Sequence, residues 1–215
     1  MLISHTYKFI FIHNYKVAGS SIKTALGPYS DISFQQYSWK KKIRATLGLY
    51  PKVYASDFIG HVKAKDLAEK LPARMYQNYF KFGFVRNPWS WQSSLYKYAL
   101  TLKEHHQHEL MKSMKSFEQY LDWRINQDFH LQKEFFYDEQ DNCLMDYIGK
   151  YETLEEDFNY VCHQTVGTNV SLPHVNKSEN DRYLKFYTPK AIDMVYEAFK
   201  EDIDTFGYEK PILKH

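Results

Sequence analysis

Of the chain's 215 residues, 44% are hydrophobic and 25% are charged, and the sequence contains only 8 Gly and 7 Pro. This composition is typical of a globular protein with a sizeable core, and it excludes a disordered or fibrous chain. A net charge of +2 does not indicate nucleic-acid binding, and no apolar run approaches the roughly 20 residues of a membrane span. The N-terminus lacks the profile of a signal peptide, so we expect a cytoplasmic protein.

Short apolar runs alternate with helix-like segments along the chain. Buried strands are predicted at Phe9–Ile12 and Tyr79–Val85, with further candidates at Val53–Ile59 and Leu144–Gly149. The loop and the start of a first helix are predicted within His13–Ser21, and this helix continues through Ile22–Leu26. Further helices are predicted at residues 65–71, 88–106, 116–126, 152–166 and 189–206. This alternation predicts an α/β fold with a central, mainly parallel β-sheet flanked by helices. We expect one domain over residues 1–215, with an excursion around residues 29–52.

The first stretch with a chemical meaning is Phe9–Leu26, a predicted strand, a polar loop and a helix start. A helix N-terminus attracts anions through its unpaired N–H groups, and here Lys16 adds a charge and Gly19 allows close approach. In ATP-binding loops the lysine follows the last glycine, whereas here it precedes Gly19, which disfavours an ATPase. Taken alone, the motif is explained equally well by an ordinary turn with a solvated lysine.

A second constellation follows the strand Tyr79–Val85. Arg86 lies at the carboxyl end of that strand, where open α/β sheets bind ligands, and Ser94 lies about two turns into the next helix. An arginine fork and a hydroxyl group suit a phosphate monoester. This second motif favours the anion-binding interpretation of the first.

Together the two motifs resemble the PAPS-dependent sulfotransferases, in particular their carbohydrate-type branch. That family's first motif reads approximately H-x-P-K-[TV]-A-G-T-S, and it is matched by His13, Lys16, Val17, Ala18, Gly19 and Ser21. The second reads approximately F-V-R-[ND]-P with a serine eight residues after the arginine, and it is matched by Arg86 and Ser94. Three positions depart from the pattern: Tyr15 replaces proline, Ser20 replaces threonine and Trp91 replaces arginine.

The resemblance implies a P-loop-like three-layer fold and an enzyme that transfers a sulfuryl group from 3′-phosphoadenosine 5′-phosphosulfate (PAPS) to a carbohydrate or glycoconjugate hydroxyl, releasing PAP without a metal. It implies that the 5′-phosphosulfate is held by Lys16, Val17, Ala18, Gly19, Ser20 and Ser21. By the same resemblance, Arg86 and Ser94 hold the 3′-phosphate. Lys16 stabilises the charge on the departing phosphate oxygen, and His61 is the base that takes the acceptor's proton.

Several alternatives stay open from the sequence. His61 also fits a packing or helix-capping role, and His13 is expected to support the loop. The His-rich run at residues 104–109 invites a metal site, but a solvated helix end is favoured because further ligands are missing. The basic cluster Lys40–Arg44 beside Trp39 fits either an anionic glycan or a solvated loop. Alternative functions are a P-loop nucleotide or metabolite kinase and a catalytically silent binding module.

Overall fold

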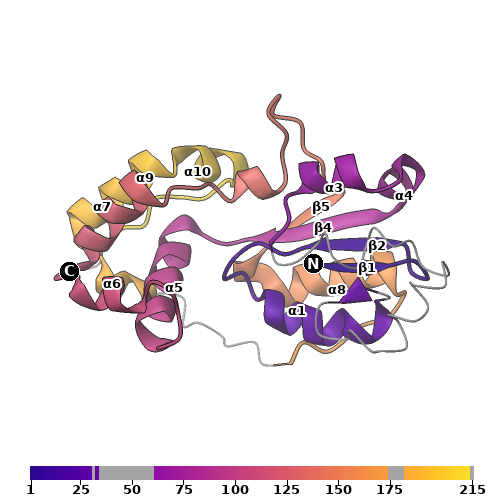
Figure 1. Ribbon diagram of the computed structural model, residues 1–215, viewed down its shortest axis with the longest axis horizontal. Coiled ribbons are helices and arrows are strands. Elements are labelled where there is room, and N and C mark those ends of the chain that lie inside the picture. Colours follow the sequence, from indigo (N-terminus) through magenta and orange to yellow (C-terminus); the bar gives the residue numbers. More distant parts are fainter. Residues whose placement is uncertain (31, 34–60, 174–181, 214–215) are drawn as a thin grey trace. The chain divides into compact units, whose positions relative to one another are not determined.

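The computed structural model describes residues 1–30, 32–33, 61–173 and 182–213 (Figure 1). The chain divides into two compact units. The sheet unit comprises Met1–Val85 and Glu134–Val175, and the helical unit comprises Arg86–Lys133 and Asn176–His215. The single domain expected over residues 1–215 stays a prediction. Most of the excursion around 29–52, with the strand candidate at 53–59 and the basic cluster at 40–44, lies outside the described residues.

The strands of the sheet unit form a five-stranded sheet in the order β3-β1-β2-β4-β5 (Figure 1). They are β1 (Leu2–Ser4), β2 (Phe9–Ile12), β3 (Ile32–Ser33), β4 (Phe80–Val85) and β5 (Tyr147–Lys150). β4 pairs in parallel with both β2 and β5, whereas β1 is antiparallel to its neighbours β2 and β3. Among the described strands, β1 alone therefore runs against the others. The predicted mainly parallel sheet is confirmed.

Helices flank this sheet on both faces, as predicted (Figure 1). They are α1 (Gly19–Leu26), α3 (Ala64–Lys70), α4 (Ala73–Asn78) and α8 (Leu154–Thr165). The apolar sides of α1 and α8 share one core with Phe11 and Phe82. Neighbouring side chains of a strand point to opposite faces. Lys81 accordingly lies on the other face, with its Nζ 5.2 Å from the ring centroid of Tyr76 in α4.

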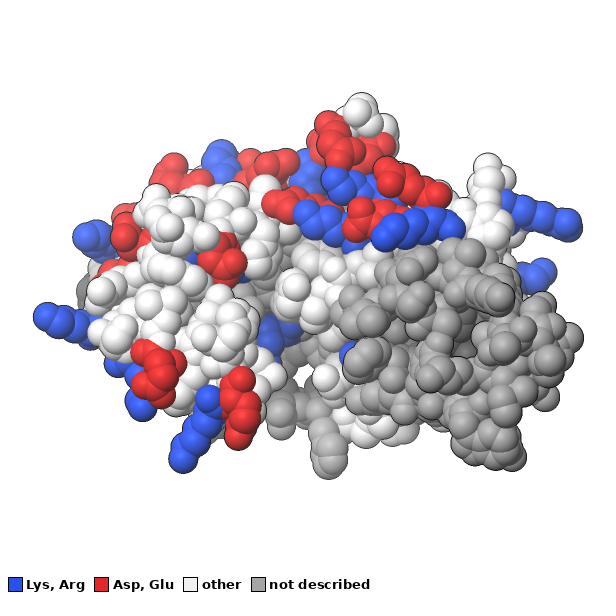
Figure 2. Space-filling view, in the orientation of Figure 1, with Lys and Arg blue, Asp and Glu red and all other residues white. Residues whose placement is uncertain are grey.

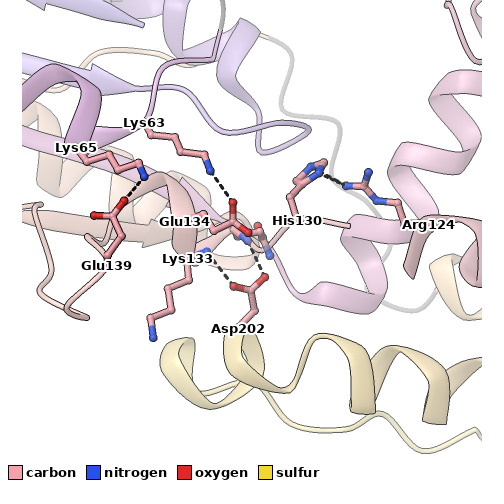
Figure 3. A network of polar contacts seen from close by, with 9 residues as sticks. Lys63, Lys65, Arg124, His130, Lys133, Glu134, Glu139 and Asp202 are labelled. Atoms are coloured by element: carbon pink, nitrogen blue, oxygen red, sulfur yellow. Dashed lines mark hydrogen bonds and ion pairs between the residues drawn. The ribbon is translucent and has the colours of Figure 1, made fainter. Parts of the chain in front are cut away.

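Ion pairs hold the chain segment that precedes β5 beside α3. Lys63 Nζ lies 2.6 Å from Glu134 Oε2, and Lys65 pairs with Glu139 (Figure 3). On the face seen in Figure 2, basic side chains lie among acidic ones over α3. Such partly exposed pairs contribute little to stability, but they neutralise one another locally.

The helical unit consists of helices packed around an aromatic core. Its helices are α5 (Pro88–Thr101), α6 (His108–Ser113), α7 (Phe117–Gln127), α9 (Pro189–Ala198) and α10 (Lys200–Phe206). The predicted start of α5 is confirmed: the side chain of Asn87 accepts hydrogen bonds from Trp89 N–H and Ser90 N–H, and Pro88 occupies the first helical position. Trp89, Tyr96 and Phe117 are buried in the core.

Some element bounds differ from the predictions. α5 ends at Thr101 instead of residue 106, because the chain turns there with a hydrogen bond from His105 N–H to Leu102 O (3.0 Å). The predicted last helix is two helices, α9 and α10, because Phe199 between them has φ −106° and ψ 22°. β1 and α4 were not predicted, since each is too short to show a periodic pattern. Short 3₁₀ turns are η1 (Gly27–Tyr29), η4 (Lys133–Phe135), η5 (Tyr151–Thr153) and η6 (Arg182–Phe186).

Within the described ranges, none of the helices combines the length and the apolar character that a bilayer crossing requires.

Candidate active site

The loop between β2 and α1 has an unusual backbone. Lys16 and Ala18 both adopt left-handed backbone conformations, with φ of 57° and 62°. Such conformations are unfavourable for residues other than glycine and concentrate at functional sites. Ala18 is the N-cap of α1 and has no side chain that could cap it. The N-cap residue therefore gives no side-chain hydrogen bond to the first turn of α1, from Gly19 to Ser21, and the N–H groups of a helix N-terminus attract anions.

Gly19 is required by the packing of His13. A Cβ atom at position 19 would lie 1.8 Å from both Cδ2 and Nε2 of the His13 ring, so no larger residue fits while the ring stays there. His13 is 9% exposed, and burial, followed by the neighbouring His61, lowers its pKa to about 2. His13 is therefore neutral near pH 7. This contact agrees with the loop-supporting role expected for His13.

His61 lies against the same loop. Its Nδ1 donates a hydrogen bond to the His13 carbonyl oxygen (2.7 Å), and its ring stacks on Tyr15 with a centroid distance of 3.7 Å. A carbonyl oxygen only accepts hydrogen bonds, so Nδ1 carries the proton in neutral imidazole and Nε2 carries the lone pair. Burial lowers the pKa of His61, while the bond to His13 opposes that shift. The geometry thus supplies a neutral imidazole whose Nε2 is a base.

The remaining loop residues differ in exposure. Val17 is fully buried in the core, so it can offer only its backbone to a ligand. Lys16, Ala18 and Ser21 are partly buried, and Ser20 is exposed. The sheet unit therefore brings together the whole predicted loop and His61, which is distant in sequence.

The helical unit contains the second motif. Arg86 directly follows β4, is 8% exposed, and donates from Nε to Ser90 Oγ (2.7 Å). Ser94, the predicted partner, is partly buried on α5, and its neighbour Ser93 is buried and donates to Trp89 O (3.1 Å). Sequence reasoning missed Ser90. The signal was available, because capping by Asn87 places Ser90 in the first turn of α5.

The side chains of the His-rich run at residues 104–109 differ in their surroundings. Among the described residues, no group of three or more His, Cys, Asp and Glu side chains is arranged to hold a metal ion. The prediction of a solvated helix end is wrong for His108, which begins α6 and is 8% exposed. Its Nδ1 donates to the carbonyl oxygen of Ala99 (2.9 Å), so it joins α6 to α5.

A loop that leads from a strand of a mainly parallel sheet into a helix N-terminus is the arrangement in which many α/β proteins bind anionic groups. The model described as "Sulfotransferase family" matches residues 1–209. The chain belongs to this family, and the resemblance to the sulfotransferases that its motifs indicated is confirmed. The protein is a sulfotransferase, an enzyme that transfers a sulfuryl group to an acceptor. Comparisons with curated proteins and with solved structures find no match.

Proposed function

We propose that this sulfotransferase uses PAPS as its donor and a hydroxyl group of a carbohydrate or glycoconjugate as its acceptor. The observation that carries the proposal is the loop of residues 16–21, which combines two residues in left-handed backbone conformations, a lysine, and a helix N-terminus whose N-cap residue is an alanine. The N–H groups and the lysine charge of this loop suit the 5′-phosphosulfate of PAPS. The carbohydrate acceptor is supported by the motif resemblance to the carbohydrate-type branch.

His61 and Lys16 have complementary roles in the proposed transfer. Nε2 of His61 takes the proton from the acceptor hydroxyl as its oxygen forms a bond to sulfur. The bond between sulfur and the phosphate oxygen breaks, and PAP leaves with the electron pair. Lys16 and the N–H groups at the start of α1 stabilise the negative charge that develops on that oxygen. PAPS supplies the sulfuryl group, so the reaction needs no other donor.

Arg86 is proposed to hold the 3′-phosphate of the donor. Its guanidinium suits a phosphate monoester, and its bond to Ser90 fixes the side chain at Nε. Ser94 stays a proposed contact of the same phosphate, as the resemblance implies. These residues belong to the helical unit, whereas the phosphosulfate loop and His61 belong to the sheet unit.

Calorimetry with PAP and with Mg-ATP tests the donor. We expect the wild-type enzyme to bind PAP and not ATP, and Arg86→Ala to weaken PAP binding. Lys97→Ala, which removes an exposed charge from α5, is the matched control and should bind PAP normally. Binding of ATP in preference to PAP would contradict the proposal and favour a kinase.

The acceptor base is tested by His61→Ala. Loss of general-base catalysis lowers turnover by about 10²–10⁴-fold. PAP affinity should stay at the wild-type value, because the proposed role of His61 concerns the acceptor. Turnover is measured by PAP release with a panel of oligosaccharide acceptors. Equal losses of turnover and of PAP affinity would instead indicate that His61 only supports the loop.

A further inference from the structure

The backbone of Arg86 is held by the side chain of a residue far along the chain. Gln132 Oε1 accepts a hydrogen bond from Arg86 N–H (2.9 Å), and Gln132 Nε2 donates to the Arg86 carbonyl oxygen (2.7 Å). The two bonds are the pair that a neighbouring strand provides to a residue within a sheet. Gln132 is fully buried. An amide provides a donor and an acceptor in one plane, which neither a carboxylate nor an alkyl group can do.

Gln132 is in turn held by a buried carboxylate. Asp202, in the first turn of α10, is fully buried. Its Oδ2 accepts from Gln132 N–H (2.8 Å), and its Oδ1 accepts from Lys133 N–H (2.9 Å), so both oxygens face the backbone at 132–133 (Figure 3). Hydrogen bonds from N–H groups to a carboxylate are stronger than bonds between neutral groups. α10 thereby fixes the backbone that carries the Gln132 side chain.

These contacts form a chain of support that ends at the Arg86 guanidinium. Asp202 holds the backbone of Gln132, and Gln132 holds the backbone of Arg86 at both its N–H and its carbonyl. Ser90 then holds the side chain at Nε. All of these residues lie in the helical unit and are at least nine-tenths buried. A guanidinium binds a phosphate through directed N–H groups, so its value as a ligand depends on such fixed placement.

We propose that Gln132 and Asp202 are positioning residues that orient Arg86 toward the 3′-phosphate of the donor. The inference rests on the proposed use of PAPS. It assigns a function to two buried polar residues that neither motif includes. It also explains why a fully buried carboxylate is placed on α10, where its bonds are to the backbone that carries Gln132.

The readout is the ratio of PAP affinity to 5′-AMP affinity, measured by calorimetry. The two ligands differ by the 3′-phosphate, so the ratio isolates the contact attributed to Arg86. We expect Gln132→Ala to lower this ratio by about tenfold, because a displaced guanidinium loses its directed bonds. Asp202→Asn should also lower this ratio. Affinity for 5′-AMP should stay at the wild-type value in both variants.

Two further variants separate positioning from general destabilisation. Gln132→Glu keeps the shape of the side chain and an acceptor oxygen, but its carboxylate cannot donate to the Arg86 carbonyl oxygen. It should therefore lower the ratio of PAP affinity to 5′-AMP affinity, and it tests the inference even if Gln132→Ala does not fold. Glu201→Gln is the matched control: Glu201 is next to Asp202, and its carboxylate pairs with Lys133 Nζ (2.8 Å). We expect this variant to keep the wild-type ratio.

A double-mutant cycle with Arg86→Ala completes the test. If Gln132 acts through Arg86, then Gln132→Ala has no further effect on the ratio once Arg86 is removed. An unchanged ratio in Gln132→Ala and Gln132→Glu overturns the inference, and so does an equal loss of PAP and 5′-AMP affinity. Failure of the proposed donor would be visible in the wild-type enzyme, which would then not prefer PAP to 5′-AMP.

Discussion

At the residue scale, Tyr15 is the departure from the family pattern that the structure explains best. Proline is usual at this position in the family that the motif resembles, and proline cannot provide an aromatic face. Here the Tyr15 ring stacks on His61 with an interplanar angle of 27°, and its edge meets Phe135 at a centroid distance of 5.6 Å. Tyr15 therefore covers one face of the proposed base and limits its rotation.

This packing gives a prediction about pH dependence. Tyr15→Ala exposes His61 to water, and since burial is what lowers the pKa of His61, that pKa should rise. The base then becomes protonated at a higher pH, so the acid limb of the kcat/KM profile should move upward in pH. Tyr15→Phe keeps the stacked ring and is the control, with an unchanged profile.

The other groups that act on the His61 pKa are His13, Lys23 and the Met1 amino group, and both substitutions leave them in place. The measurement is kcat/KM between pH 5 and 8, about the range in which imidazole titrates. If the acid limbs of Tyr15→Ala and of the wild-type enzyme coincide, Tyr15 does not control the base.

Gly19 provides a second prediction at this scale. An alanine there would place its Cβ 1.8 Å from the His13 ring, so either the ring or the loop must move. Overpacking of this kind costs about 1–3 kcal/mol of unfolding free energy. We expect Gly19→Ala to lower stability by that amount in urea titrations and to weaken PAP binding.

Ser20→Ala, at the exposed neighbouring position, is the control for Gly19→Ala and should leave the unfolding free energy nearly unchanged. Adding His13→Ala to Gly19→Ala makes room for the new methyl group. The double variant should therefore bind PAP better than Gly19→Ala does. No such recovery would mean that the clash with His13 is not the cause.

The residue scale also sets the limit of prediction from sequence. Lys16, Gly19, Arg86 and their neighbours were identified because each lies in a short motif of contiguous residues. The support around them was not identified, because Gln132 reaches Arg86 across a sequence separation of 46 residues. A glutamine with no local pattern gives no signal before the chain is folded.

At the element scale, the junction of β5 and α8 depends on Asp157. Carboxylates in the first turn of a helix, such as those in the first turn of α8, complement the helix dipole. Asp157 does more, because it accepts hydrogen bonds from Tyr147 O–H (2.6 Å), Lys150 N–H (2.7 Å) and Thr153 O–H (2.7 Å). One side chain thus joins the strand, the turn and the helix.

We therefore predict that Asp157→Asn lowers the free energy of unfolding by about 1–3 kcal/mol, because hydrogen bonds to a charged acceptor are lost or weakened. Glu155→Gln is the control: it removes an exposed carboxylate from the same turn of α8 and should cost about 0.5 kcal/mol or less. Urea denaturation measures both. Equal stabilities of the two variants would show that Asp157 acts only through the dipole.

The elements themselves were predictable to different degrees. β2 and β4 were identified closely, because continuous apolar runs such as Phe9–Ile12 are typical of strands buried on both faces. The break between α9 and α10 was not, because Phe199 continues the apolar periodicity while its backbone leaves the helical region. Its ring is fully buried and contacts Trp91 at a centroid distance of 6.1 Å. The position of the break between α9 and α10 is therefore set by the tertiary packing of Phe199 and not by the local apolar periodicity.

At the scale of the whole molecule, the alternation of strands and helices was enough to predict the α/β class and the parallel core of the sheet. It did not predict β1, whose antiparallel pairing places it between β2 and β3. β1 has three residues, and its burial on both faces follows from its neighbours more than from its own pattern. Strand order depends on contacts between distant segments, which composition and periodicity do not encode.

The buried His13 ties the stability of the fold to pH. Its pKa is lowered from 6.5 to about 2 in the folded protein, mainly by burial. Between these values the unfolded chain binds a proton at His13 that the folded protein does not, so the contribution of His13 to the free energy of unfolding falls as the pH falls below about 6.5. One histidine contributes a slope of up to about 1.4 kcal/mol per pH unit.

We predict that His13→Gln makes this dependence shallower. Urea titrations at pH 7.5, 6.5 and 5.5 should show the wild-type protein losing stability at the lower pH by about 1 kcal/mol more than His13→Gln does. His163→Gln, a substitution at an exposed position of α8 that leaves His13 and its packing in place, should keep the wild-type slope. If His13→Gln keeps the full slope as well, the acid sensitivity arises elsewhere, and His13 is not the group that couples protonation to unfolding.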